Sequence, residues 1–167
     1  PVQMRAAGDV VGKLLTMEIS MIVSNVANVT AVISPEGLVR RKELEKYDDT
    51  IEKLLGYRTK AFRCPYGEYN DNVITTVRDM GYEVWQWDID TIDWKEERSA
   101  QTILDTVLPK LHPGCVILCH NNGYKIKEYL PTLIETAQEQ GYEFVTVSEL
   151  RLEGDTIIDV NGTQKAA

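Results

Sequence analysis

Short apolar runs alternate with longer amphipathic segments along the chain from residue 33 onward. The short runs predict strands, and apolar residues that recur every three or four positions predict helices. Strand and helix in alternation are typical of a parallel sheet with helices on its faces, so the predicted fold class is α/β. Helices are expected over 38–55, 71–80, 100–111 and 126–139, and strands near 61–63, 84–89, 115–119 and 142–147.

Residues 1–32 fit this alternation less well. The run at 17–23 (MEISMIV) predicts a strand, and the small, uncharged, β-branched residues that follow it fit either a strand or a covered loop. After Gly154, an Asn161-Gly162 pair predicts a short hairpin at the C-terminus.

Several helix ends are marked by residues that favour them. Asn70 or Asp71 is expected to cap the second helix and Gly81 to end it. Gly56 is expected to end the first helix. The apolar face of the first helix is expected to comprise Leu38, Leu44, Ile51, Leu54 and Leu55.

Charged and aromatic residues gather where the predicted strands end. Arg63 follows one strand, Asp93 and Trp94 follow the next, and His120 follows the apolar run at 115–119. The carboxyl ends of parallel strands form one edge of a sheet, and this edge is where α/β proteins usually bind ligands. The sequence therefore predicts a functional site at this edge.

Bulk composition excludes some partners. The length of 167 residues is typical of a single domain, and the net charge of −8 argues against nucleic acid and anionic membranes as partners. No apolar stretch is long enough for a membrane span, and residues 1–15 lack the pattern of a signal peptide, so no compartment is predicted. Cys64, Cys115 and Cys119 are expected to be reduced thiols in the core.

Three motifs in a fixed order resemble one known family. FRCPYG at 62–67, DTIDW at 90–94 and VILCH at 116–120 are similar to the Arg-x-Pro-Tyr-Gly, Asp-x-x-Asp-Trp and Leu-x-His motifs of the NodB homology domain. This is the domain of polysaccharide deacetylases of carbohydrate esterase family 4. The resemblance covers roughly residues 33–150. It implies a single domain over 1–167, poorly matched over 1–32, with a distorted (β/α) barrel that lacks its first strands.

The resemblance also implies catalytic roles. His120 corresponds to the general acid, and Asp93 to the carboxylate that orients it. Arg63 corresponds to the arginine that positions the catalytic base, and the backbone N–H of Tyr66 to an oxyanion donor.

Substrate contacts are implied in the same way. Trp94 and Leu118 correspond to the hydrophobic walls of a pocket for the acetyl group, and Pro65 belongs to the substrate-binding motif of the turn. The implied partner is an acetylated amino-sugar glycan, and members of the family are often secreted or at the cell surface.

The family's metal site has no counterpart in the sequence. The family holds a divalent metal such as zinc with one aspartate and two histidines, whereas this chain has only His112 and His120. By spacing, Ile22 and Val26 stand where the metal histidines belong, and neither side chain can bind a metal. The Thr-Phe-Asp-Asp motif that supplies the family's base is also absent. We therefore expect no metal ligands and no cofactor in this chain.

Two functional hypotheses remain open at this point. The chain is either a deacetylase that hydrolyses N-acetyl bonds, or an inactive relative that binds glycan or acts as a structural module. In the simpler alternatives His120 is a structural histidine, Asp90 is a turn residue and Trp94 is a core residue. An incomplete barrel would also expose a sheet edge, which either self-association into a homo-oligomer or residues 1–32 could cover.

Overall fold

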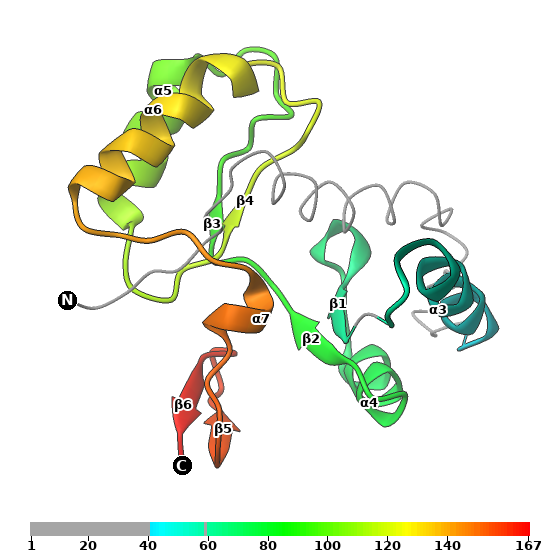
Figure 1. Cartoon of the computed structure of the whole chain (residues 1–167). Coiled ribbons are helices and arrows are strands. Elements are labelled where there is room, and N and C mark those ends of the chain that lie inside the picture. Colours follow the sequence, from blue (N-terminus) through cyan, green and yellow to red (C-terminus); the bar gives the residue numbers. More distant parts are fainter. Residues whose placement is uncertain (1–40, 59) are drawn as a thin grey trace. The chain divides into compact units, whose positions relative to one another are not determined.

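The computed structural model describes residues 41–58 and 60–167, which form two compact units (Figure 1). Within these residues the first unit ends at Gln86 and the second begins at Trp87. The predictions for residues 1–40, including the strand at 17–23, lie outside the described residues, and the single domain over 1–167 stays a prediction.

The first unit packs two helices with a pair of short parallel strands. Strand β1 pairs with β2 in the register Ala61↔Glu83 and Arg63↔Trp85. A buried cluster lies between these elements and contains Leu44, Phe62, Cys64, Val73, Val77 and Tyr82. The elements in chain order are α3 (Arg41–Leu55), β1 (Ala61–Arg63), η1 (Pro65–Gly67), α4 (Asp71–Asp79) and β2 (Glu83–Trp85).

Helix α4 begins where the sequence predicts. The Asn70 side chain accepts a hydrogen bond from the Val73 backbone N–H at 2.9 Å, which satisfies one of the free donors of the first helical turn. Val73 and Val77, one turn apart, are buried. Gly81 follows the helix with a φ of 88°, a left-handed conformation that glycine adopts without a steric penalty.

The prediction for the apolar face of helix α3 was partly wrong. Leu44 and Ile51 are buried, but Leu54 is 72% exposed and Leu55 is 38% exposed. The buried cluster of the first unit contacts α3 through Leu44, and the last turn of the helix extends past that cluster. Periodicity predicts which face of a helix is apolar, but not how far along the helix its packing partner continues.

The second unit contains a helix pair, two parallel strands and a C-terminal hairpin. Helices α5 and α6 lie side by side (Figure 1) and enclose a core that includes Ile89, Ile103, Val107, Tyr129 and Leu133. The elements in chain order are β3 (Ile89–Asp90), α5 (Ala100–Val107), η2 (Leu108–Lys110), β4 (Ile117–Leu118), α6 (Ile126–Glu139), α7 (Val147–Leu150), β5 (Thr156–Ile158) and β6 (Gln164–Ala166).

The strand predicted over 142–147 was wrong: residues 142–146 form neither strand nor helix, and the short helix α7 begins at Val147. Thr146 and Glu149 make a capping box: the Thr146 side chain accepts from the Glu149 N–H, and the Glu149 carboxylate accepts from the Thr146 N–H at 2.9 Å. These local bonds satisfy backbone donors that a strand would have paired with a neighbour. The one strand predicted over 84–89 is instead two short strands in different pairs, β2 and β3, and the strand predicted over 115–119 is shorter than expected.

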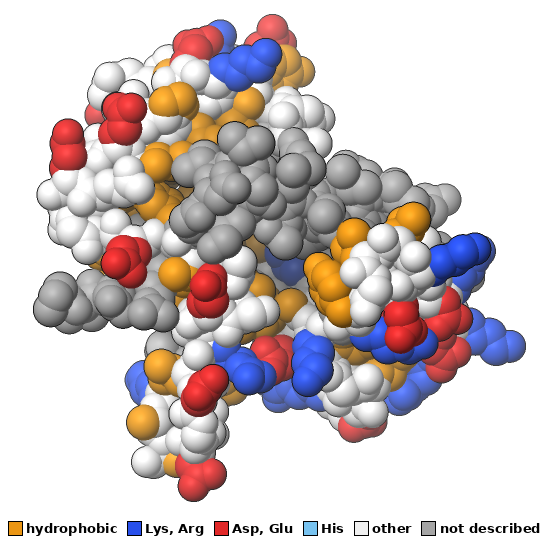
Figure 2. Space-filling model, viewed as in Figure 1, with side chains coloured by type: hydrophobic (Ala, Val, Ile, Leu, Met, Phe, Trp, Pro, Cys, Tyr) orange, Lys and Arg blue, Asp and Glu red, His pale blue; other side chains and the backbone are white. Residues whose placement is uncertain are grey.

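The described residues have an α/β architecture with two parallel strand pairs and one antiparallel pair. The hairpin of β5 and β6 confirms the predicted turn at Asn161-Gly162, and hydrophobic side chains are exposed on it (Figure 2). Cys64, Cys115 and Cys119 are buried free thiols, as predicted. No helix among the described residues is long and apolar enough to cross a membrane.

The Asn70 cap gives a testable prediction for the first unit. Asn70→Ala removes the side-chain acceptor of the Val73 N–H and should lower the free energy of unfolding by about 1 kcal/mol, as measured by urea unfolding. Asn72→Ala is the matched control: Asn72 lies inside α4, so alanine there should be neutral or slightly stabilising. Equal effects of the two substitutions would contradict the assigned cap.

Candidate active site

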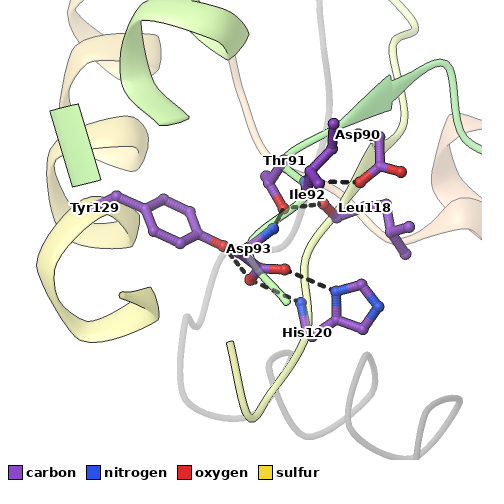
Figure 3. Close-up of polar contacts among 7 residues, drawn as sticks. All are labelled: Asp90, Thr91, Ile92, Asp93, Leu118, His120 and Tyr129. Carbon is purple, nitrogen blue, oxygen red and sulfur yellow. Dashed lines mark hydrogen bonds and ion pairs between the residues drawn. The ribbon is translucent and has the colours of Figure 1, made fainter. Parts of the chain in front are cut away.

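Two strand ends bring Asp93 and His120 together. Strands β3 and β4 run parallel with Asp90 opposite Leu118, so the residues that follow each strand lie next to each other. Thr91 extends the pairing, since its backbone N–H and its hydroxyl both donate to the Leu118 carbonyl oxygen, at 3.2 and 2.8 Å (Figure 3). The prediction that polar residues meet at this edge is confirmed for Asp93 and His120.

A tight turn after β3 sets the direction of Asp93. The Asp90 carboxylate accepts a hydrogen bond from the Ile92 backbone N–H at 2.8 Å, and Ile92 has a φ of 53°. A β-branched residue in this left-handed region costs on the order of 1–3 kcal/mol, so the surrounding bonds must hold it there. Beyond the turn, Asp93 is 1% exposed, whereas Trp94 is 55% exposed. Asp90 is thus a turn residue, as one of the simpler alternatives had it.

The Asp93 carboxylate is buried and accepts hydrogen bonds at both oxygens. Oδ1 lies 2.7 Å from His120 Nδ1. Oδ2 accepts from the His120 backbone N–H at 3.0 Å and from the Tyr129 hydroxyl at 2.7 Å (Figure 3). A buried carboxylate without such partners would be strongly unfavourable, so these donors are what allow Asp93 to lie in the core.

The contact with Asp93 fixes the imidazole of His120. An ionised carboxylate only accepts hydrogen bonds, so Nδ1 carries the proton and the neutral ring keeps its lone pair on Nε2. The His120 side chain is 30% exposed, and Nε2 has no hydrogen-bond partner among the described residues. Nε2 is therefore the ring atom that can exchange a proton with a bound molecule, as a general acid or base requires.

Gly123 is essential to this geometry, and the sequence analysis missed it. A Cβ built on Gly123 would lie 2.2 Å from Asp93 Oδ2. The loop around it is tied on both sides, because the Gly123 N–H donates to the His120 carbonyl at 2.9 Å and the Tyr124 N–H donates to the Asp93 carbonyl at 3.0 Å. Only a residue without a side chain fits between this loop and the carboxylate.

Tyr129 is the second residue that the sequence analysis missed. It was read only as part of the predicted helix over 126–139, whose buried stripe is Tyr129, Leu133 and Ala137, four residues apart. A tyrosine in a buried stripe needs a hydrogen-bond partner for its hydroxyl, so the position of Tyr129 in this stripe could have indicated a polar group beneath the helix. It did not identify Asp93 as the partner.

The remaining predicted residues divide between the two units. In the second unit Leu118 is buried in β4, and Trp94 is exposed with Lys95 Nζ 5.2 Å from its ring centroid. In the first unit Arg63 ends β1 and is exposed, while Pro65 opens the turn η1. Tyr66 is 85% exposed and has a φ of 56°.

The residues described do not fit a catalytic metal of the family type. Among residues 41–58 and 60–167 there is no group of three or more His, Cys, Asp or Glu side chains that could hold an ion. His120 uses Nδ1 for Asp93, and His112 has its ring nitrogens against Asp88 Oδ2 (2.5 Å) and the Pro113 carbonyl (3.0 Å). Both histidines of the sequence are thus paired within the second unit.

Comparison with known proteins identifies relatives of this chain. Residues 33–85 match the model of the family described as polysaccharide deacetylase. Among curated proteins, the peptidoglycan-N-acetylmuramic acid deacetylase PdaC of Bacillus subtilis is 37% identical over 109 residues, which are 65% of this chain and 22% of that protein. The peptidoglycan-N-acetylglucosamine deacetylase of Bacillus cereus is 33% identical over 114 residues, 66% of this chain and 41% of that protein. This chain thus spans well under half the length of either relative.

Solved structures give a consistent picture. A CE4 family pseudoenzyme from Bacillus anthracis superposes with a TM-score of 0.60 and 32% identity over 66% of this chain and 38% of that one. A mutant of the same pseudoenzyme with restored enzymatic activity gives a TM-score of 0.60 and 33% identity, over 66% of this chain and 40% of that one.

Gly123 provides the prediction for this site. Gly123→Ala should push the Asp93 carboxylate from its position and lower the free energy of unfolding by about 1–3 kcal/mol, the usual range for overpacking. Hydrogen exchange of the His120 backbone amide, which donates to Asp93 Oδ2, should become selectively faster.

Gly114→Ala is the control for this prediction. A Cβ there meets nothing within 4 Å, although the φ of 83° adds backbone strain. It should lower global stability without a selective effect at His120. A Gly123→Ala protein with native protection of the His120 amide would contradict the steric argument.

Proposed function

Because this chain belongs to the polysaccharide deacetylase family and has a domain of the NodB type, we propose that it acts on acetylated amino-sugar glycans. The reaction for which its site is built is hydrolysis of the N-acetyl carbon–nitrogen bond. The observation that carries this proposal is the Asp93–His120 pair at adjoining strand ends. A single domain over 1–167, folded as a distorted (β/α) barrel without its first strands, is part of the proposal.

In this proposal His120 is the general acid. When the amide bond breaks, the departing amine needs a proton, and Nε2 of the partly exposed His120 side chain is the atom that would deliver it. Asp93 holds the ring through Nδ1 and stabilises the positive charge that the ring carries before it transfers its proton. The burial of Asp93 strengthens this interaction, because few water molecules screen it.

The other site residues take the roles that their motifs suggest. Arg63 would position a base, and the backbone N–H of Tyr66 would donate to the oxyanion, next to the substrate-binding Pro65. The left-handed backbone of Tyr66 supports its role, since strained residues cluster at functional sites. Trp94 and Leu118 would line the pocket for the acetyl group, and the exposure of the Trp94 ring leaves it accessible to a sugar.

A second candidate function is glycan binding without turnover. A specific observation favours it: the family metal needs two histidines, and both histidines of this chain are paired with aspartates in the second unit. We propose that this chain holds no catalytic metal by itself, and we derive no catalytic step through one. It would then contribute the acid half of a deacetylase site and bind the glycan there.

Metal content, acetate release and glycan binding separate the two candidates. If the chain binds glycan without turnover, elemental analysis after incubation with zinc or cobalt should find no stoichiometric ion, and an N-acetylated chito-oligomer should release no acetate. Calorimetry should still detect binding of the oligomer. Trp94→Ala should weaken it roughly tenfold, as expected for the loss of one aromatic contact, whereas Tyr57→Ala, at an exposed tyrosine after α3, should leave it unchanged.

Either of two other results would change the conclusion. A bound ion together with acetate release would establish the chain as an active deacetylase and reject binding without turnover. Neither binding nor release would reject both candidates.

We also propose that the chain self-associates through an exposed sheet edge. Each strand pair in the described residues has only two strands, and hydrophobic side chains are exposed on the C-terminal hairpin (Figure 2). They belong to Ile157, Ile158 and Val160. Light scattering should show a mass that rises with concentration, and Ile158→Lys should reduce it because a charge on an edge strand opposes pairing. Thr163→Lys in the hairpin turn should not. A monomer at every concentration would contradict this proposal.

A further inference from the structure

The Tyr129 hydroxyl is a polar group in an otherwise apolar helix interface. Tyr129 is 0% exposed and packs in the core cluster with Ile103, Val107 and Leu133. Its hydroxyl reaches out of that cluster to Asp93 Oδ2 at 2.7 Å, from helix α6 (Figure 3). Tyr129 therefore connects a helix in the core directly to the carboxylate that holds His120.

The direction of this hydrogen bond follows from the chemistry of its partners. An ionised carboxylate accepts only, so the Tyr129 hydroxyl must donate to Asp93. Burial raises the pKa of Tyr129 far above its usual value, so the hydroxyl keeps its proton. The Cys119 thiol also contacts this hydroxyl, and burial raises its pKa to about 12. The thiol therefore stays neutral, and as a weak acceptor it does not compete with the Asp93 carboxylate for the hydroxyl proton.

This donor decides how the two oxygens of Asp93 are used. Oδ2 accepts from Tyr129 and from the His120 backbone N–H, while Oδ1 faces His120 Nδ1. Rotation of the carboxylate about its Cβ–Cγ bond would break these bonds together. Without the Tyr129 hydroxyl, the side-chain hydrogen bonds of Asp93 that remain among the described residues are the two to His120.

We propose that Tyr129 is a positioning residue that acts through Asp93, locking the carboxylate so that His120 keeps its proton on Nδ1 and presents Nε2 to a bound glycan. The transfer of a proton from Nε2 to a glycan rests on the proposed function above. The locking of Asp93 and the choice of the ring tautomer do not, because they depend only on contacts within this chain.

The test uses Tyr129→Phe, which removes the hydroxyl and keeps the ring. In ¹⁵N-labelled protein without substrate, NMR reports the tautomer of His120 and the rate at which its Nδ1 proton exchanges with water. We expect that exchange to become about fivefold faster or more, in line with the loss of one buried hydrogen bond, and the Nδ1–H tautomer to lose population. Tyr142→Phe is the matched control, since its hydroxyl donates to the Leu111 carbonyl at 3.2 Å instead of to Asp93.

Three outcomes are decisive. A change in the His120 ring signals in Tyr129→Phe but not in Tyr142→Phe supports the proposal. A loss of stability in Tyr129→Phe with native ring signals overturns it, because a purely structural role would have that effect. Equal changes in both variants also overturn it.

A measurement on the native protein covers the case in which Tyr129→Phe does not fold. A slowly exchanging Tyr129 hydroxyl proton, with a coupling to the ¹³C-labelled carboxyl carbon of Asp93, is then expected. A rapidly exchanging hydroxyl proton without such a coupling would overturn the proposal. Since none of these readouts needs catalysis, a chain that releases no acetate would reject the deacetylase function and leave the role of Tyr129 to be decided by NMR.

Discussion

The burial of one negative charge organises the second unit. Asp93 lies in the core, where an ionised carboxylate is tolerated only if its oxygens are hydrogen-bonded. Its partners come from two segments that are distant in the sequence, the end of β4 and helix α6, and the Tyr124 N–H fastens the following loop to its backbone. Strands β3 and β4 are only two residues long and would hold this region together weakly by themselves. The polar contacts of Asp93 therefore serve the fold and the site together.

Local signals in the sequence were sufficient for most helices and for the edge that holds the site. The predicted bounds of α6 agree with the structure, and so does the Asn70 cap, because periodicity and capping depend on neighbouring residues. The strand expected over 142–147 did not form, although its residues are aromatic and β-branched. The Thr146 capping box, which is also a local signal, begins a helix at the end of this run. Gly123 and Tyr129 could not be assigned from the sequence, because their importance depends on a distance to Asp93 that no spacing encodes.

The chemistry of the site divides into two halves with different structural requirements. A general acid needs only a histidine and an oriented carboxylate, which two neighbouring strand ends can supply. A metal site needs several ligands from separate segments at fixed distances. Replacement of those ligand side chains is enough to abolish metal binding. Relatives named as peptidoglycan deacetylases and a relative named as a pseudoenzyme both resemble this chain. In the proposed function, the Asp93–His120 pair also stabilises the core, so its retention would not depend on a metal site.

The positions of the loop after His120 differ in how well they can tolerate a substitution. Asn121, Asn122 and Tyr124 are exposed, whereas Gly123 is pressed against Asp93. In terms of tolerance to substitution, a side chain at Gly123 is excluded by contact with Asp93, whereas the three exposed side chains beside it are open to replacement. The surface next to His120 can therefore change in shape and polarity while Gly123 keeps Asp93 and His120 in place.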